Sequence, residues 1–247
     1  MTDTEKFLQM VRKCDNIVFF GGAGVSTESG IPDFRSVDGL YNQKYAYPPE
    51  TILSHSFYIQ KTEEFYRFYR EKMLCLTAQP NITHKKLAEL EAAGKVKAVI
   101  TQNIDGLHQL AGSKKVLELH GSIHRNYCRK CGKEFDADYI LNAKTNVPLC
   151  DKCCGQIKPD VVLYEEGLNQ QTLEDAVFYI SHADMLIVGG TSLAVYPAAG
   201  LIDYYRGDKL VLINKSTTPM DNRADLLIQA GLGDVFEQIE MEGLLRG

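Results

Sequence analysis

Apolar residues follow two patterns that alternate along the chain. Short, nearly continuous apolar runs are typical of buried strands, and they lie at residues 17–20, 96–101, 116–119, 185–188, 209–213 and 225–229. Apolar residues at helical spacing lie at residues 3–13, 62–75, 81–93, 170–183 and 196–205, and a last helix starts near Gly233. Strands that alternate with helices predict an α/β fold with a mostly parallel, doubly wound sheet.

Other segments add detail to this pattern. Residues 36–60 show no clean period, so we expect a long, partly irregular segment that either moves over a ligand or forms a static surface loop. Residues 161–164 form a further extended run. Asn81 is the expected cap and Gly94 the expected stop of the helix between them, on which His84 is expected to be structural.

A loop rich in glycine and hydroxyl side chains follows the first apolar run. Gly22 and Gly24 match the first two glycines of the dinucleotide-binding fingerprint, which let the backbone approach a pyrophosphate closely. Ser26 and Thr27 are candidate caps of a following helix, whose N-terminus would favour the same anion. Thr27 also stands where the fingerprint has its third glycine, and no second strand ends in an acid about 20 residues later. The loop alone is therefore a weak signal, and an ordinary tight turn is the alternative.

Polar side chains follow two further predicted strands. Gln102, Asn103 and Asp105 come directly after the second run, and His120 follows the third. Ligands of open α/β sheets bind at the carboxyl ends of strands. Amide, carboxylate and imidazole groups there can bind ribose hydroxyls and a carboxamide, and can move a proton near neutral pH. Residues 189–192 form a second glycine and hydroxyl turn that suits phosphate or ribose.

Four of the seven cysteines fall into two Cys-x-x-Cys pairs. The pairs are Cys128 with Cys131 and Cys150 with Cys153, and 18 residues separate them. This spacing is typical of a four-cysteine zinc ribbon, whose metal is tetrahedral, closed and structural. Cys154 competes with Cys153 as a ligand, but the two-residue spacing favours Cys153. The alternative is a redox dithiol, which two matched pairs at ribbon spacing disfavour.

Composition narrows the partners and the compartment. A chain of 247 residues that is 45% hydrophobic can bury one sizeable core and a smaller module. The net charge of −5 gives no broad basic footprint, so direct nucleic-acid binding is not expected. No apolar run has signal-peptide or membrane-spanning length, and the cysteine pattern favours metal over disulfides. We expect a cytoplasmic protein with no membrane partner, and the sequence does not predict its oligomeric state.

Taken together, these motifs resemble the sirtuins, the NAD-dependent protein lysine deacylases, in the family's own order. The resemblance spans nearly the whole chain and rests on the paired cysteines and on residues 22–26, 30–35, 102–105, 120–121 and 190–192. It implies a bacterial or archaeal type with a Rossmann-type NAD-binding domain and a smaller domain of a helical insert and the zinc ribbon. The implied boundaries are residues 1–35, 76–120 and 161–247 for the large domain, and 36–75 and 121–160 for the small one.

The resemblance also implies the reaction. The acetyl group of acetyl-lysine moves to ADP-ribose, and nicotinamide, O-acetyl-ADP-ribose and the deacetylated protein are released. NAD is then a co-substrate, one structural Zn²⁺ binds per chain, and acetylated proteins or peptides are the partners.

Individual residues take implied roles at the matching positions. His120 is the base that acts on the ribose hydroxyls, because an imidazole titrates near neutral pH. Gln102 and Asn103 orient ribose and water, and Ile104 and Asp105 hold the carboxamide. The other implied NAD-binding residues are Ala23, Thr27, Phe34, Arg35, Thr191, Ser192, Asn214 and Asp234, among which Phe34 shields the reacting carbon.

The implied substrate site is an extended edge that pairs with the peptide backbone. It comprises Val161, Val162, Leu163 and Tyr164. The family usually has Phe-Gly-Glu from position 164 onward, whereas this chain has Tyr, Glu and Glu. A glycine would let a peptide backbone approach closely, so Glu165 is expected to affect substrate register or affinity.

Acyl preference follows from the helix at residues 62–75. Sirtuins that prefer succinyl or malonyl lysine carry a Tyr-x-x-Arg pair on the corresponding helix. Tyr66 matches the tyrosine, but Tyr69 stands at the arginine position, and neither Arg67 nor Arg70 is expected to point down the acyl tunnel. The resemblance therefore predicts a preference for acetyl and for neutral apolar acyl groups.

Several other functions compete with this interpretation. Mono-ADP-ribosyl transfer, or removal of a longer acyl group, uses the same NAD chemistry, and the sequence hardly separates them from deacetylation. An idle NAD- and zinc-containing scaffold would be expected to lose the histidine or the Asn-Ile-Asp run, and both are present. A dehydrogenase is disfavoured by the missing third glycine and the missing ribose-binding acid.

Overall fold

Six parallel strands form the larger of two sheets. The computed structural model describes residues 1–33, 39 and 47–243. Within that part of the chain, the strand order is β3-β2-β1-β7-β8-β9, and every pairing is parallel. The strands are β1 (Ile17–Gly21), β2 (Val96–Thr101), β3 (Val116–Glu118), β7 (Met185–Gly189), β8 (Leu210–Ile213) and β9 (Leu226–Ile228). This sheet confirms the predicted doubly wound α/β fold.

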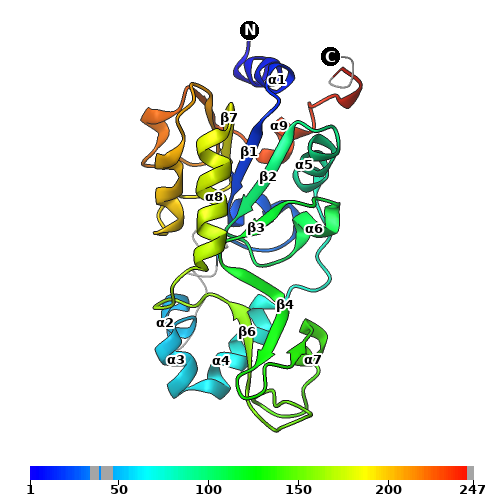
Figure 1. Ribbon diagram of the computed structural model, residues 1–247, viewed down its shortest axis with the longest axis vertical. Coiled ribbons are helices and arrows are strands. Elements are labelled where there is room, and N and C mark those ends of the chain that lie inside the picture. The colour runs from blue at the N-terminus through cyan, green and yellow to red at the C-terminus, as the bar shows by residue number, and fades with distance from the viewer. Residues whose placement is uncertain (34–38, 40–46, 244–247) are drawn as a thin grey trace.

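Helices cover both faces of this sheet (Figure 1). Side chains of β1 alternate between the two layers, because Phe19 packs into one apolar cluster and Phe20 into the other. The first cluster contains residues of α1 (Asp3–Lys13), α5 (Ile82–Ala92) and α9 (Leu232–Phe236). The second contains residues of α8 (Gln170–His182) and of the 3₁₀ helix η5 (Ala198–Tyr204). The core therefore consists of two layers with the sheet between them.

A smaller, antiparallel sheet lies at one end of the molecule (Figure 1). Its order is β5-β4-β6, with β4 (Gly121–Cys128), β5 (Glu134–Phe135) and β6 (Ile157–Val161). The surrounding helices are α2 (Pro49–Ile52), α3 (His55–Gln60), α4 (Thr62–Phe68) and α7 (Ala137–Leu141), and a π-helical turn, η4 (Tyr69–Met73), continues α4. These elements share a separate apolar cluster.

Several predicted elements differ from the structure. The described part of the segment expected to be irregular contains the helices α2 and α3, and the rest of residues 36–48 lies largely outside the described residues. No clean period marks α3 because two adjacent side chains, Phe57 and Tyr58, are both buried. Its start is set by Ser54, whose hydroxyl accepts from Phe57 N at 3.2 Å. The helix predicted from residue 196 is a 3₁₀ helix that begins at Ala198.

The extended run at residues 161–164 is only partly a strand. β6 ends at Val161, and Tyr164 makes an isolated parallel bridge to Ser54. The predicted cap and stop of α5 are confirmed at Asn81 and Gly94, where φ is +75°. Among the described residues, no helix is long and apolar enough to cross a membrane.

Candidate active site

Two glycine turns meet where the strand order of the large sheet reverses. β1 lies between β2 and β7, from which the chain extends the sheet in opposite directions. Gly24 N donates to Gly190 O at 2.8 Å, and a Cβ atom on Gly24 would lie 2.8 Å from the Gly190 Cα. Only glycine fits so close an approach. The crevice at such a switch point is where open α/β sheets bind nucleotides.

The loop after Gly22 is not the start of a long helix. It forms two 3₁₀ turns, η1 (Ala23–Val25) and η2 (Thr27–Ser29), and neither turn has a side-chain cap. The expected helix is absent as far as Asp33, where this described stretch ends. The prediction that Ser26 and Thr27 cap a helix is therefore wrong, and the physical reason is that their hydroxyls bond elsewhere.

Ser26 joins the glycine loop to the loop after β2. Its side chain is buried, and its hydroxyl donates to Asp105 Oδ2 at 2.6 Å and accepts from Asn103 Nδ2 at 3.0 Å. Asp105 Oδ1 accepts from Leu107 N at 2.9 Å, so both carboxylate oxygens are held. Sequence reasoning missed this role of Ser26, because its partners lie 77 and 79 residues away.

His120 lies at the junction of the two sheets, between β3 and β4. Its Nδ1 lies 2.9 Å from Gln102 O. A carbonyl oxygen only accepts, so Nδ1 carries the proton and Nε2 of the neutral ring can accept another. Burial lowers the pKa of His120, and the hydrogen bond to Gln102 offsets part of this effect. The ring is therefore neutral, and able to act as a base, at neutral pH.

Hydrogen bonds cross the crevice from the loop after β2 to the end of β8. Gln102 Nε2 donates to Thr191 Oγ1 at 3.0 Å, and Thr191 N donates to Asn214 Oδ1 at 3.1 Å. Asn214 is 8% exposed, and its Nδ2 has no hydrogen-bond partner among the described residues. A buried amide donor without a partner is costly, so a ligand that accepts a hydrogen bond is expected here. The oxygen-rich ribose and pyrophosphate of NAD fit this donor and the glycine crevice.

Other predicted NAD-binding residues also lie in segments that follow the strands of the large sheet. Ala23 begins η1, and Thr27 Oγ1 donates to Gly24 O at 3.0 Å. Ser192 follows the glycine turn after β7. Asp234 is exposed in the first turn of α9, which follows β9.

The predicted nicotinamide end of the site is described only in part. Ile104 belongs to the loop after β2, and its carbonyl accepts from Ile123 N of β4 at 3.0 Å. This bond ties the loop to the small sheet. Phe34 and Arg35 lie outside the described residues.

Two buried histidines lie behind the glycine loop. The rings of His84 and His108 are 4.7 Å apart, and Asn81 N donates to His84 Nδ1 at 3.3 Å. Burial lowers the pKa of His84 to about 4, although nearby Asp105 acts in the opposite direction. Asn81 Nδ2 donates to Val25 O at 2.7 Å, so the helix cap that His84 completes also anchors the glycine loop.

The predicted peptide-binding residues continue from an edge strand. β6 is the last strand in the order β5-β4-β6, and Val162 N donates to His120 O at 3.0 Å. Tyr164 N donates to Leu53 O at 2.9 Å, and Tyr164 O accepts from His55 N at 3.0 Å. The segment is therefore held against the helical part of the small unit and lies directly beside His120.

Glu165 adopts a backbone conformation that favours glycine. Its φ is +75°, which costs a residue with a Cβ atom about 1–2 kcal/mol. Its Oε2 accepts from Ser56 N at 2.9 Å and from Ser56 Oγ at 2.6 Å. These two hydrogen bonds lower the pKa of Glu165. Where the family usually has glycine, this chain thus has a glutamate in a left-handed backbone conformation, and its carboxylate bonds to Ser56.

The four predicted zinc ligands come together in the small unit. The sulfur atoms of Cys128, Cys131, Cys150 and Cys153 all lie within 4.8 Å of one another. Tetrahedral zinc with Zn–S bonds of about 2.3 Å needs sulfur atoms about 3.8 Å apart. Lys130 N and Lys152 N each lie 3.4 Å from the first sulfur of their pair and donate to it. This set fits one structural Zn²⁺, and the exposed Cys154 is outside it.

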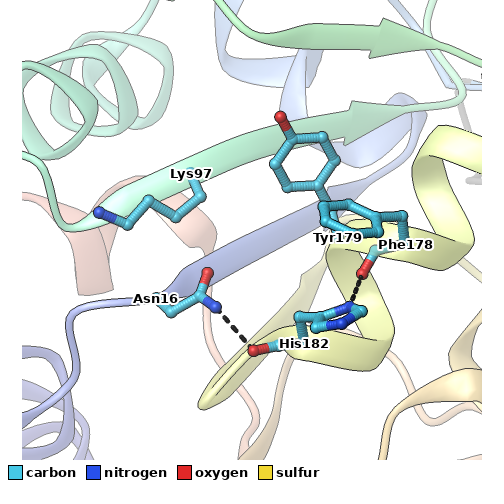
Figure 2. Close-up of a pocket in the computed structure, with 5 residues that line it drawn as sticks. All are labelled: Asn16, Lys97, Phe178, Tyr179 and His182. Atoms are coloured by element: carbon cyan, nitrogen blue, oxygen red, sulfur yellow. Dashed lines mark hydrogen bonds between the residues drawn. The ribbon is translucent and has the colours of Figure 1, made fainter.

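A pocket of about 450 Å³ lies near the starts of the strands of the large sheet, and Figure 2 shows its lining residues. Asn16 precedes β1, and its Nδ2 donates to the carbonyl of His182, which lies at the end of α8. Lys97, Phe178 and Tyr179 complete the lining. The pocket therefore sits at the amino ends of the strands, away from the glycine turns and His120.

The fold and the site together define a nucleotide-binding α/β protein with a histidine base and a four-cysteine zinc module. The sequence model of the Sir2 family matches residues 22–197. With that match, which covers more than half of the sequence, the chain belongs to the Sir2 family.

Relatives named "NAD-dependent protein deacetylase" match nearly the whole chain. The protein of Clostridium acetobutylicum is 61% identical over 233 residues, which is 94% of this chain and 95% of that protein. The protein of Clostridium tetani is 59% identical over 97% of this chain and 98% of its own length. A solved Sir2 structure with deacetylated p53 peptide and 3′-O-acetyl ADP-ribose has a TM-score of 0.90 at 41% identity, over 98% of this chain and 99% of that chain.

Proposed function

We propose that the chain is an NAD-dependent protein lysine deacetylase. It transfers the acetyl group of acetyl-lysine to ADP-ribose and releases nicotinamide, O-acetyl-ADP-ribose and the deacetylated protein. The observation that carries the proposal is the position of His120, whose Nδ1–H is fixed by Gln102 O beside the glycine crevice. Full-length relatives named for this activity, at up to 61% identity, support it.

NAD supplies an activated bond between nicotinamide and ribose when it is bound. Gly22, Gly24 and Gly190 let the two turns pack closely against each other, and we assign the pyrophosphate to the crevice that these turns form. Asn214 Nδ2 and the residues around Thr191 bind the adenosine half. Asp105, held by Ser26, and Ile104 bind the nicotinamide carboxamide. We assign Ala23, Thr27, Phe34, Arg35, Ser192 and Asp234 to the rest of the NAD site.

His120 accepts a proton from a ribose hydroxyl at Nε2. The neutral tautomer leaves this nitrogen unprotonated, and the lowered pKa keeps it so through neutral pH. Asn103 donates to Ser26 through Nδ2, so its Oδ1 is the atom that orients a water. Gln102 positions both the His120 ring, through its carbonyl, and Thr191, through its side chain.

The acetylated peptide adds as a strand to the segment that begins at the last residue of β6. Val161, Val162, Leu163 and Tyr164 form this edge, and Val162 N donates to His120 O. Strand addition supplies backbone hydrogen bonds whatever the peptide sequence, and it places the acyl-lysine beside the base.

Two broader assignments complete the proposal. We assign residues 1–35, 76–120 and 161–247 to the large domain and residues 36–75 and 121–160 to the small one. The separate sheets and apolar clusters support this division. At its last boundary the small unit extends further, because Val161 ends β6 and Val161 and Leu163 pack in the small unit's cluster. We place the protein in the cytoplasm because the spacing of its paired cysteines favours metal binding over disulfides.

The test is a measurement of nicotinamide release with NAD and an acetyl-lysine peptide. We expect release only with the acetylated peptide, together with one equivalent of deacetylated peptide and O-acetyl-ADP-ribose by mass spectrometry. The same peptide with unmodified lysine is the control. Nicotinamide release that does not depend on the acetyl group, with ADP-ribose attached to protein, would support mono-ADP-ribosyl transfer instead.

A further inference from the structure

Glu165 joins the proposed peptide edge to the helical part of the small unit. We propose that Glu165 is a positioning residue for substrate binding, whose carboxylate holds the segment Val161–Tyr164 in its peptide-pairing conformation before the peptide arrives. The inference rests on the proposed function, because that segment is the proposed peptide site.

The turn at residues 163–166 needs an external contact to keep its shape. Glu166 N donates to Leu163 O at 3.0 Å, which closes a four-residue β-turn. Glu165 is the third residue of this turn, and its φ of +75° is the conformation for which type II turns select glycine. A residue with a side chain stays in such a conformation only when its surroundings hold it there.

Backbone hydrogen bonds hold Tyr164 to Leu53 and His55, and Ser56 supplies the contact at Glu165 itself. Ser56 is the second residue of α3, and both its backbone N–H and its hydroxyl donate to Glu165 Oε2, at 2.9 and 2.6 Å. Glu165 and Ser56 are 109 residues apart in the sequence, so the contact connects the turn after β6 to a separate helix. Hydrogen bonds to a charged acceptor are stronger than those between neutral groups.

The neighbouring acid has a different function. Glu166 Oε2 accepts from Leu163 N at 2.9 Å and from Lys158 Nζ at 3.1 Å, which ties the turn back to its own strand. Glu166 Oε1 lies 2.8 Å from His55 Nδ1. Glu166 thus makes the turn compact and also reaches the first residue of α3, whereas both hydrogen bonds of Glu165 go to the second residue of α3.

A preformed edge lowers the cost of peptide binding. Strand addition orders the edge as well as the peptide, and an edge that is already held does not have to be ordered on binding. The carboxylate of Glu165 bonds to Ser56 of α3, whereas the hydrogen bonds across the crevice join Gln102, Thr191 and Asn214. Loss of the Glu165 carboxylate should therefore weaken peptide binding and leave NAD binding unchanged.

The experiment compares three variants at Glu165 with a control. Glu165→Ala removes the carboxylate and keeps the strained backbone, Glu165→Gly removes both, and Glu165→Gln keeps an oxygen for Ser56. Glu174→Ala is the matched control, because Glu174 is an exposed acid on α8. KM for an acetyl-lysine peptide, KM for NAD, and kcat at saturation of both are measured for each.

We expect Glu165→Ala to raise the KM for peptide roughly tenfold, while the KM for NAD and kcat stay within about twofold. Glu165→Gln should recover most of the peptide affinity, and Glu165→Gly should lie between Gln and Ala. An unchanged KM for peptide in Glu165→Ala would overturn the inference. Equal increases in the KM for peptide and the KM for NAD would also overturn it. So would wild-type behaviour of Glu165→Gly, because the carboxylate would then only offset the backbone strain at position 165.

Amide hydrogen exchange without substrates tests the contact independently of activity. We expect faster exchange at residues 163–166 and at Ser56 in Glu165→Ala than in the wild type and Glu174→Ala. Unchanged exchange would overturn the inference even if the enzyme deacetylates peptides. A wild-type chain that shows no acetyl-dependent NAD consumption would instead refute the proposed function, and with it the role of the contact in substrate binding.

Discussion

The two sheets of this protein are stabilised in different ways. The central strands β1 and β7 of the large sheet are buried at every position, because mainly aliphatic layers cover both faces. β4 of the small sheet mixes buried and exposed positions, as expected for a sheet that is covered on one face. The small unit's cluster is instead rich in buried aromatic rings and contains two of the four clustered cysteines as buried residues.

This difference follows from size. A large sheet with helices on both faces buries enough apolar surface to be stable, whereas a small unit does not and needs a metal or other cross-links. The active-site groups come from the stable sheet, and the proposed peptide edge comes from the small one. We expect chemistry and substrate binding to respond separately to changes in the two regions.

Zinc removal should destabilise the protein more than any of the other changes that we propose. The loss of structure should begin in the small unit, which contains the cysteine cluster. Cys150→Ala removes one of four thiolates from a closed site, whose binding energy is also folding energy of roughly 10 kcal/mol. We expect loss of the bound zinc and of deacetylation. Metal analysis of the wild type should give one zinc per chain.

Cys154→Ala is the matched control, because Cys154 is adjacent to the cluster but exposed and outside it. It should retain the zinc and the activity. Unchanged stability and activity in Cys150→Ala would show that the cluster does not hold a structural metal.

His120→Ala should stop the reaction without releasing NAD. The side chain acts on a proton, while the cofactor is held mainly by the glycine turns, so turnover should fall on the order of 10²-fold or more. Calorimetric titration with NAD and turnover of an acetylated peptide measure the two effects. His182→Ala is the control, because His182 lines the pocket near the starts of the strands of the large sheet (Figure 2). Turnover of His120→Ala within a few fold of the wild type would make His120 structural.

Acid should destabilise the large unit through its buried histidines. The pKa of His84 is about 4 in the folded chain and about 6.5 in the unfolded chain, so the unfolded chain binds more protons between these values. The stabilisation is therefore complete above pH 6.5 and is lost as the pH falls towards 4, by about 3 kcal/mol. Urea unfolding with excess zinc measures it. His84→Gln should flatten the dependence of the free energy of unfolding on pH, and His182→Ala should leave it unchanged. Equal pH dependence for the wild type and His84→Gln would contradict the assignment of this stabilisation to His84.

Patterns within short stretches were predicted well from the sequence. The alternation of strands and helices in an α/β fold and the paired cysteines depend on local period and spacing, and the structure shows the parallel α/β sheet and the clustering of the four cysteines. Contacts between distant segments were not predicted. A serine such as Ser26 is an ordinary helix cap in the sequence, and only the fold brings it to Asp105. The pairing of Glu165 with Ser56 was missed for the same reason.

The smallest predicted effect concerns the acyl group, and it depends on how the small unit uses its arginines. Arg70 Nε donates to Ile140 O at 2.9 Å, and its Nη1 and Nη2 donate to the carbonyls of Asn146 and Thr145, each at 3.0 Å. All three of these guanidinium nitrogens therefore bond to backbone carbonyls between residues 140 and 146 of the small unit. Arg67 is exposed to solvent. Arg67 therefore lies outside the buried aromatic cluster that contains Tyr66 and Tyr69.

Tyr69 occupies the position at which the resemblance to succinyl-preferring sirtuins would require arginine. It is fully buried, and burial raises the pKa of its phenol, so the phenol stays neutral. A neutral phenol offers no positive charge to an acid. A succinyl group would then be buried without a cationic partner, which costs more than the lost contact. We expect kcat/KM on one peptide to be at least about tenfold higher for acetyl-lysine than for succinyl-lysine. Tyr69→Arg should narrow this ratio and Arg67→Ala should leave it unchanged, whereas equal or better succinyl removal by the wild type would mean that Arg67 or Arg70 reaches the acyl group.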